Sequence, residues 1–302
     1  MSRKSIMEHL TNPRLIVLAG PTAVGKTSLA IKLALHLDTE IVSCDSRQLY
    51  KELDIGVARP TQDELSQVKH HFIASHSIHD EYNAGRYAVE VNELLTVLFK
   101  TKNTVIMTGG TGLYIQAATL GLDILPQANQ ELRRELKEIL NTKGISELQS
   151  RADNLKLSRD NVEYENPQRL MRAIEIAEVE PQETVKKQIT RAYDTTYLYV
   201  NRERNELYDR INQRVDIMLE DGFEDEARSV YPFKEINALQ TVGYREFFKY
   251  FDGDWTREEA IEKMKQKTRN YAKRQLTWFR NQGDYIEVKP SLDSALEAIR
   301  KL

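Results

Sequence analysis

The segment of this 302-residue sequence with the clearest chemistry is a glycine-containing loop that ends in lysine and threonine. It matches the pattern G-x-x-x-x-G-K-[ST] in full, and its residues are Gly20, Pro21, Thr22, Ala23, Val24, Gly25, Lys26 and Thr27. In such a P-loop, backbone N–H groups converge on phosphate oxygens, and the following helix adds a favourable dipole. We expect Lys26 to reach a terminal phosphate and the Thr27 hydroxyl to hold Mg²⁺. The loop therefore predicts a site for a diphosphate or a polyphosphate.

A carboxylate is expected beside this loop. P-loop NTPases usually place an aspartate at the end of another apolar strand, where it holds Mg²⁺. The apolar segment 104–108 ends instead in Gly-Gly-Thr-Gly, and the acid that closes a strand-like segment is Asp45. The carboxyl ends of parallel strands line the ligand crevice, so Asp45 is predicted to face the phosphates. The alternative is that Asp45 only caps the turn that follows it, because Asp is a common N-cap.

The hydrophobic pattern supplies the elements that must hold these residues. Strands are predicted at 15–19, 40–44, 104–108, 195–200 and 286–288, and helices at 27–37, 83–100, 205–221, 223–230, 243–250 and 257–281. Strands that alternate with helices predict a parallel sheet covered on both faces. Between 122 and 194 the pattern changes to polar helices, at 129–141, 145–154 and 167–179. We therefore predict an α/β fold: a P-loop NTPase-like parallel sheet flanked by helices (1–121 and 195–302), with an all-helical insertion domain (122–194).

Composition limits the classes of partner. The chain has 43 Lys and Arg against 46 Asp and Glu, a net charge of −3, so a nucleic-acid partner would need a local basic patch. The single cysteine, Cys44, excludes a disulfide framework and a cysteine-based zinc site, and it fits a reducing compartment. No apolar run approaches the ~20 residues that span a bilayer. The first residues are polar, so we expect no secretory signal, no membrane partner and a cytoplasmic location.

A local basic patch is present near the C-terminal end. Lysines and arginines follow one another without an intervening acid, with aromatic residues among them: Lys265, Lys267, Arg269, Tyr271, Lys273, Arg274, Trp278, Phe279 and Arg280. Such a run is typical of phosphate contacts in nucleic-acid binding, and also of a solvated helix face. A histidine cluster (His70, His71, His76 and His79) lacks the spacing of a metal-ligand set, and we expect no metal there.

A series of motifs follows the P-loop in order along nearly the whole chain. They are DSRQLY (45–50), DIGVARPT (54–61), HHFI (70–73), YNAGRY (82–87), TGGTGLYIQA (108–117), LPQANQELR (125–133), NPQRLMRAIE (166–175), ELYDRINQRVDIMLEDGFEDEA (206–227), ALQTVGYRE (238–246) and YAKRQLTWFR (271–280). Together they resemble the bacterial type of the tRNA dimethylallyltransferase (tRNA isopentenyltransferase) family. The chain departs from that pattern at Arg47 and Val57, where the family often reads DSMQVY and GTAKPT.

The resemblance implies transfer of a dimethylallyl group from dimethylallyl diphosphate to N6 of the adenosine 3′-adjacent to the anticodon in tRNA. It implies that the P-loop grips the diphosphate of the prenyl donor rather than a nucleotide, with Mg²⁺ as cofactor. The partner would be the tRNA anticodon stem-loop, and we expect a monomer. Catalytic roles fall on Asp45, Thr111 and Arg210. Predicted tRNA contacts are Asp45, Ser46, Arg47, Gln48, Thr111, Arg133, Gln168, Arg169, Leu170, Met171, Arg172, Lys273 and Arg274.

The residues alone leave simpler interpretations open at two of these positions. Thr111 could be a turn residue between glycines, and Arg210 with Arg214 has the i,i+4 spacing of a solvated helix face.

Three other functions remain as alternatives. The chain could prenylate free adenylate, although a small acceptor needs neither the insertion nor the basic segment. It could be a small-molecule kinase that binds ATP at the P-loop and uses Asp45 as base. It could also bind RNA without catalysis, although the presence together of Lys26, Thr27, Asp45 and Thr111 argues against this.

Overall fold

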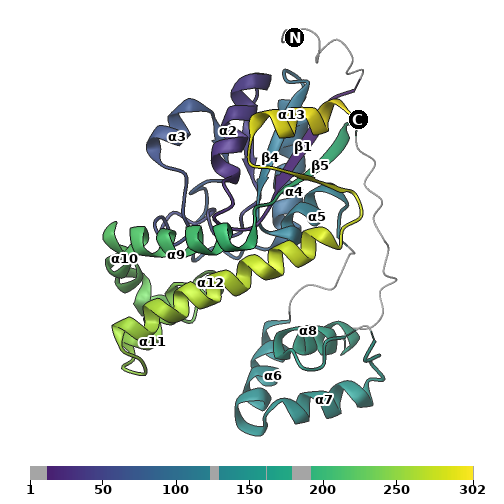
Figure 1. Cartoon of the computed structure of the whole chain (residues 1–302). Coiled ribbons are helices and arrows are strands. Elements are labelled where there is room, and N and C mark those ends of the chain that lie inside the picture. The colour runs from purple at the N-terminus through teal and green to yellow at the C-terminus, as the bar shows by residue number, and fades with distance from the viewer. Residues whose placement is uncertain (1–11, 123–128, 161, 179–191, 302) are drawn as a thin grey trace. The chain divides into compact units, whose positions relative to one another are not determined.

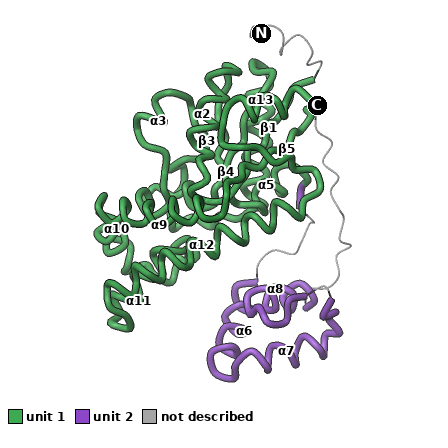
Figure 2. The backbone as a smooth tube through the Cα atoms, viewed as in Figure 1, with its two compact units in different colours: residues 1–120, 190–302 green, residues 121–189 purple. Residues whose placement is uncertain are grey.

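The computed structural model describes residues 12–122, 129–160, 162–178 and 192–301. The chain forms two compact units, one of residues 1–120 with 190–302 and one of residues 121–189 (Figure 2). Each unit has its own hydrophobic core. Residues 125–128, which begin the LPQANQELR motif, lie outside the described residues. So does residue 179, the last of the helix predicted at 167–179.

A parallel sheet forms the centre of the first unit (Figure 1). Its six described strands are β1 (Arg14–Ala19), β2 (Ile41–Ser43), β3 (His70–His71), β4 (Thr104–Gly109), β5 (Asp194–Val200) and β6 (Tyr285–Val288). They are arranged in the order β3-β2-β4-β1-β5-β6, and every pairing is parallel. β1 therefore lies between β4 and β5, which accounts for its continuous apolar sequence. The predicted α/β class is confirmed.

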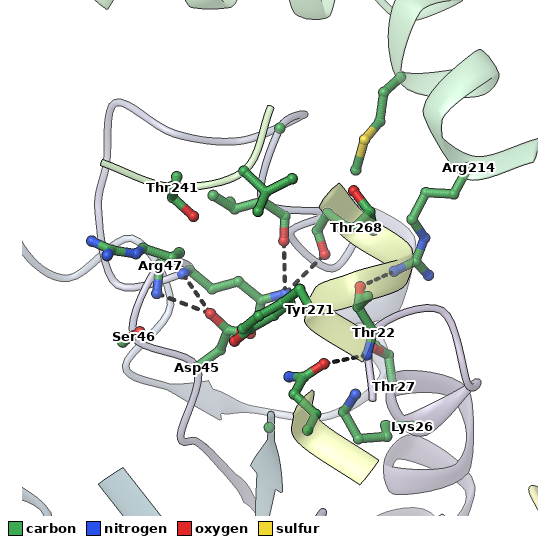
Figure 3. A pocket seen from close by; sticks show the side chains of 18 of the residues that line it. Thr22, Lys26, Thr27, Asp45, Ser46, Arg47, Arg214, Thr241, Thr268 and Tyr271 are labelled. Carbon is green, nitrogen blue, oxygen red and sulfur yellow. Dashed lines mark hydrogen bonds between the residues drawn. The ribbon is translucent and has the colours of Figure 1, made fainter. Parts of the chain in front are cut away.

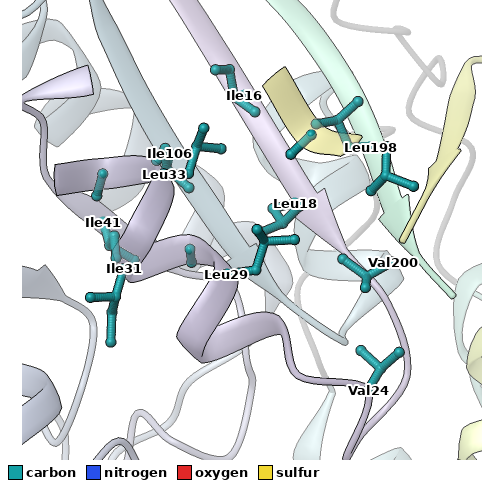
Figure 4. Close-up of a cluster of buried hydrophobic side chains, with 14 of the residues drawn as sticks. Ile16, Leu18, Val24, Leu29, Ile31, Leu33, Ile41, Ile106, Leu198 and Val200 are labelled. Carbon is teal, nitrogen blue, oxygen red and sulfur yellow. The ribbon is translucent and has the colours of Figure 1, made fainter. Parts of the chain in front are cut away.

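Helices cover both faces of the sheet. Those of the first unit are α2 (Lys26–Leu37), α3 (Gln62–Gln67), α4 (Ala84–Leu98), α5 (Gly112–Thr119), α9 (Arg204–Glu220), α10 (Phe223–Val230), α11 (Tyr244–Phe251), α12 (Arg257–Arg280) and α13 (Leu292–Arg300), with 3-10 turns η1 (Tyr231–Phe233) and η2 (Asn237–Leu239). One core cluster joins Leu18 of β1 to Leu33 of α2 (Figure 4). Ile299 of α13 belongs to the same cluster. On α4, Tyr87 stacks on Tyr114 of α5 and donates to the Ser43 carbonyl of β2 at 2.9 Å.

Besides the two 3-10 turns, four described elements were not predicted from the sequence. α3 is polar with no buried residue, and it is stabilised at its start by a capping box between Thr61 and Glu64 rather than by an apolar face. β3 has only two residues at the edge of the sheet. α5 begins within the Gly-Gly-Thr-Gly sequence, whose glycines are typical of a turn. α13 lies beyond the last predicted strand and packs its buried face on α2.

The second unit contains helices and no strand within its described residues. It comprises α6 (Gln130–Lys143), α7 (Ile145–Asn154) and α8 (Pro167–Glu178), whose apolar faces meet at Leu136, Leu148 and Ile174. α6 is capped by Asn129, whose side chain accepts from two backbone amides of the first turn. In the described part of the chain, no helix has the length and apolar character needed to cross a membrane.

Candidate active site

A cavity of about 450 Å³ opens in the first unit at the carboxyl ends of the strands (Figure 3). The P-loop, which follows β1, forms one wall of this cavity, and the loop after β2 and the last residue of β4 contribute Asp45 and Gly109. α9 and α12 line two further sides, and residues 56–60 and 240–245 also contribute. This is the edge at which parallel α/β sheets bind ligands, and the volume is in the range of small-molecule sites.

The P-loop holds its shape through unusual backbone angles. Gly20 has φ 152°, and a Cβ at this position would lie 2.8 Å from the Val200 carbonyl of β5. Ala23 has φ 63°, in the left-handed region that non-glycine residues rarely adopt. Strain of this kind persists where the surrounding structure fixes the backbone, and it clusters at ligand sites. Within the loop, the residues that line the cavity are Thr22, Lys26 and Thr27.

Lys26 has a shifted acidity. Its Nζ donates to the Pro21 carbonyl at 2.6 Å. Burial lowers the pKa of the ammonium to about 8, although the charge of Asp45 acts in the opposite direction. Arg214 lowers the pKa of Lys26 further through like-charge repulsion. An anion bound here would relieve both effects, as expected of a phosphate site.

Two arginines of α9 turn toward the P-loop rather than toward solvent. The Nε of Arg210 donates to the Ala23 carbonyl at 2.8 Å, so this residue holds the backbone of the loop. The Nη1 of Arg214 lies 3.3 Å from the Thr22 hydroxyl, and Arg214 lines the cavity (Figure 3). Burial and the neighbouring Arg210 lower the pKa of Arg214. The interpretation as a solvated face is wrong for this pair, and Arg214 is a candidate that was not predicted from the sequence.

Asp45 both caps a turn and faces the cavity. Its Oδ1 accepts from the backbone amides of Arg47 at 2.9 Å and Gln48 at 3.4 Å. Within the described residues its second oxygen accepts no hydrogen bond, and the side chain lines the cavity. The two interpretations of Asp45 from sequence are therefore compatible.

Thr111 supports the loop that carries Asp45. Its Oγ1 accepts from the Ser46 backbone amide at 3.1 Å and donates to the Ser46 hydroxyl at 3.2 Å. Burial raises the pKa of Tyr271, on α12, to about 12, and the neighbouring Thr111 side chain acts in the opposite direction. Thr111 itself does not line the cavity, whereas Ser46 and Tyr271 do.

The two departures from the family pattern have structural partners. The Nη1 of Arg47 donates to the carbonyls of Asn237 and Ala238, at 3.1 and 3.0 Å, which ties the Asp45 loop to η2. Val57 packs against the core formed by α9 to α12, and its carbonyl accepts from Gln48 Nε2 at 3.3 Å. Both side chains also line the cavity.

The residues of the predicted basic patch on α12 differ in what they contact. Arg274 lines the cavity with its guanidinium 5.7 Å from the Tyr271 ring centroid, whereas Lys273, which is also exposed, does not line it. Lys265 pairs with Asp216 at 2.6 Å, and Arg269 donates to the Asn212 side chain of α9 at 2.5 Å. Only part of the patch is therefore available to a partner.

In the second unit, Arg133 and Arg172 converge on one carboxylate. Glu175 is 1% exposed and accepts from Arg133 at 3.0 Å, from Arg172 at 2.6 Å and from the Asn129 amide at 2.6 Å. These three hydrogen bonds lower the pKa of Glu175 against the opposing effect of burial.

The other predicted contacts on α8 differ in exposure. Gln168 and Arg169 are exposed, Met171 is half-buried, and Leu170 is fully buried in the core of this unit. Arg169 pairs at the surface with Glu163.

Four residues of α12 line the cavity without having been selected from the sequence as site residues, and of these only Tyr271 had been noted, as an aromatic residue of the basic patch. Met264, Thr268, Tyr271 and Gln275 recur at three- and four-residue intervals, so they share one face of the helix. That spacing was readable in the sequence. The basic residues between them, however, favoured the interpretation that this helix faces solvent or nucleic acid. Thr241 and Arg245, from the ALQTVGYRE motif, also line the cavity and were missed.

The clustered histidines have partners other than a metal. His71 bonds to Glu40 at 2.6 Å, His76 pairs with Glu90 at 3.4 Å, and His70 contacts the Val68 carbonyl at 2.8 Å. His79 packs edge-on against Phe233.

Comparison with known proteins decides the family. The sequence model of the IPP transferase family matches residues 48–282. This chain belongs to that family. The tRNA dimethylallyltransferase of Flavobacterium psychrophilum is 43% identical over 94% of this chain and 97% of its own. The enzyme of the same name from Flavobacterium johnsoniae is 45% identical over 88% of this chain and 90% of its own.

Solved structures agree with this family. The tRNA isopentenylpyrophosphate transferase of Bacillus halodurans superposes with a TM-score of 0.70 at 33% identity, covering 95% of this chain and 94% of that one. A eukaryotic dimethylallyltransferase acting on tRNA superposes with a TM-score of 0.72 at 25% identity, covering 92% of this chain and 74% of that one. The IPP transferase fold of this chain is thus P-loop NTPase-like, as predicted.

The lowered pKa of Lys26 predicts a pH dependence. Above about pH 8 the free ammonium loses its proton, so affinity for inorganic diphosphate should fall with rising pH, by up to about tenfold per unit. Isothermal titration calorimetry between pH 7 and 9.5 measures this. Lys26→Arg is the matched control, because its guanidinium stays charged while the titration of diphosphate itself is unchanged. Equal slopes for the two proteins would contradict the assignment of Lys26.

Proposed function

We propose that this protein is a tRNA dimethylallyltransferase that modifies N6 of the adenosine 3′-adjacent to the anticodon. The observation that carries the proposal is one cavity that combines cations for a diphosphate, from Lys26 and Arg214, with the carboxylate of Asp45. The names of its relatives, tRNA dimethylallyltransferase, support the same reaction. Since its substrate is tRNA, we propose that it acts in the cytoplasm as a monomer.

The chemistry follows from these groups. The adenine N6 lone pair forms a bond to C1 of the dimethylallyl group as the C1–O bond to diphosphate breaks, and the leaving diphosphate takes the bonding electron pair. Lys26 and Arg214 stabilise the negative charge that develops on the leaving group. The N6 nitrogen becomes acidic as its new bond forms, and Asp45 accepts the proton. Arg210 holds the P-loop backbone in the conformation that this requires.

The residues present fit a bound Mg²⁺. This ion keeps several waters and is usually held by one or two side chains together with substrate phosphates. The Thr27 hydroxyl and the Asp45 carboxylate both line the cavity, and we propose Thr27 as the direct ligand. Bound there, Mg²⁺ would neutralise charge on the diphosphate.

An apolar wall supports a prenyl donor over a nucleotide. Ile211, Val215, Met218 and Met264 line the cavity from α9 and α12. A five-carbon allyl group buries apolar surface there, and the same residues exclude water from an electron-deficient carbon. A kinase transfers a phosphoryl group to a polar acceptor, so its reaction does not require an apolar surface beside the terminal phosphate.

We further propose that tRNA binds at both units. In the first unit the contacts are Asp45, Ser46, Arg47, Gln48, Lys273 and Arg274, with Thr111 acting behind Ser46. The insertion contributes Arg133, Gln168, Arg169, Met171 and Arg172, while Leu170 supports α8 from the core. The target base must leave its stack to reach the cavity.

Mass spectrometry of nucleosides tests the function. After incubation with Mg²⁺ and dimethylallyl diphosphate, we expect adenosine in tRNA to gain the mass of one dimethylallyl group without ATP. AMP, as the alternative acceptor, should stay unmodified. Modification of AMP would favour the adenylate prenyltransferase, and ATP-dependent phosphorylation would favour the kinase.

Asp45→Asn tests the general base. Turnover should fall by about 10²–10⁴-fold, because the amide cannot take the N6 proton. Folding and tRNA affinity should persist, since Asn keeps an oxygen that can cap the turn at Arg47. Single-turnover kinetics measures the loss of rate, and its dependence on tRNA concentration gives the tRNA affinity. Thermal melting is the control for folding. Near-normal turnover would leave Asp45 as a cap alone.

Arg169→Ala tests the insertion as a tRNA clamp. We expect weaker tRNA binding and a shallower dependence of log Kd on log salt, by about 0.7–0.9 for each phosphate that is no longer neutralised. Arg159→Ala is the matched control, because Arg159 is 64% exposed and paired with Asp153, as Arg169 is 67% exposed and paired with Glu163. Equal effects of the two substitutions would argue against a specific clamp. Arg172 is unsuited to this test, since its loss also breaks the pairing with Glu175.

A further inference from the structure

The side chain that joins the P-loop to the loop after β4 belongs to neither of them. Gln275, on α12, is 6% exposed, and both ends of its amide are bonded. Its Oε1 accepts from the Thr22 backbone amide at 3.0 Å, and its Nε2 donates to the Gly110 carbonyl at 2.9 Å. One amide therefore links the loops that follow β1 and β4.

The second of these loops leads directly to the Asp45 loop. Gly110 lies so close to Gln275 that a Cβ on this glycine would overlap Nε2. The next residue is Thr111, whose hydroxyl is bonded to both the backbone amide and the hydroxyl of Ser46. A continuous path of hydrogen bonds and one peptide unit therefore runs from the P-loop to the residue beside Asp45.

Packing alone does not require an amide at this position. The neighbouring buried positions on the same helix are Ala272 and Phe279, both apolar. A buried amide is unfavourable unless its donor and acceptor are both satisfied. Glutamine supplies one acceptor for Thr22 and one donor for Gly110, whereas glutamate would lack the donor and methionine would lack both.

We propose that Gln275 is a positioning residue that couples the P-loop to the Thr111 and Asp45 loops. Occupation of the P-loop by diphosphate then orders the groups that face the acceptor base. The identity of the two substrates rests on the proposed function, but the coupling itself rests only on the contacts of Gln275. It acts through Thr22 and Gly110.

Hydrogen exchange with inorganic diphosphate and Mg²⁺ tests the coupling without catalysis. In the wild type, diphosphate should slow exchange in the P-loop, residues 20–27, and also in residues 109–116. In Gln275→Met, protection should persist at 20–27 and fall by about tenfold at 109–116. The reason is that local opening of residues 109–116 is no longer linked to the P-loop. Protection at 109–116 that is equal in both proteins, or absent in the wild type, overturns the proposal.

Two further variants keep the test interpretable. If Gln275→Met does not fold, Gln275→Glu serves instead, since it can still accept from Thr22 but cannot donate to Gly110, and the same loss at 109–116 is expected. Asn92→Ala is the matched control: Asn92 is another bridging amide, which donates to the Ala88 and Ala118 carbonyls at 2.6 and 3.2 Å away from the cavity. It should leave the coupled protection intact.

Turnover separates this proposal from the proposed function. With active wild type, Gln275→Met should lower kcat by about 10²-fold, the effect of misplacing reactive groups by about 1 Å. The Kd values for diphosphate and tRNA should stay within about threefold. Unchanged kcat, or loss of diphosphate affinity in proportion to kcat, overturns the positioning role. If the wild type modifies no tRNA but shows the coupled protection, the proposed function fails and the coupling stands.

Discussion

Three cationic side chains converge on a single loop, and much of the first unit serves to hold them there. Lys26, Arg210 and Arg214 repel one another, and burial and this repulsion lower the pKa of Lys26 and of Arg214. Their donors are met by P-loop oxygens, the carbonyls of Pro21 and Ala23 and the hydroxyl of Thr22. The arrangement is electrostatically unfavourable until an anion enters, so a diphosphate gains binding energy by relieving it.

The scaffold can sustain this repulsion because the elements that bear the charges are anchored in the core. α9 buries Leu207 and Ile211 in the same apolar cluster that packs α2 on the sheet. Because the arginines share the helix with these anchors, the backbone that carries them cannot move away from the loop without exposing apolar surface. Burial of side chains on one face of α9 thus offsets the cost of the charge that its other residues bring to the phosphates.

Sequence reasoning recovered the sheet and the P-loop because both depend on local patterns. β1 is a continuous apolar run, and the P-loop pattern has a fixed spacing. The assignments that failed depend on tertiary context. Arg214 looked like surface charge because helical spacing gives the separation of two side chains but not the direction in which both point. The spacing of Gln275 on α12 indicates the face of the helix that it shares, but not its bridging role, which arises only when the loops of two distant strands meet it.

The predicted contacts in the insertion show the same limit. The resemblance suggested that Arg169, Leu170 and Arg172 all contact tRNA, but it carried no information on the burial of each side chain. In the structure Arg169 is exposed, Arg172 is bonded to Glu175, and Leu170 lies in the core. Motifs identify which residues a fold retains. The burial of each side chain determines whether it contacts a partner or supports a neighbour.

The position of the insertion within the chain has a consequence for synthesis on the ribosome. The central strand β1 pairs on one side with β5, at the register of Arg14 with Asp194, and β5 in turn pairs with β6. The nascent sheet therefore stays incomplete, with an exposed edge on β1, until the whole insertion has been translated. The insertion has a core of its own made from contacts close in sequence, and such contacts form quickly. It can thus reach its structure while β1 still awaits its pairing with β5, and the interval before β5 emerges is then a period of exposure to aggregation.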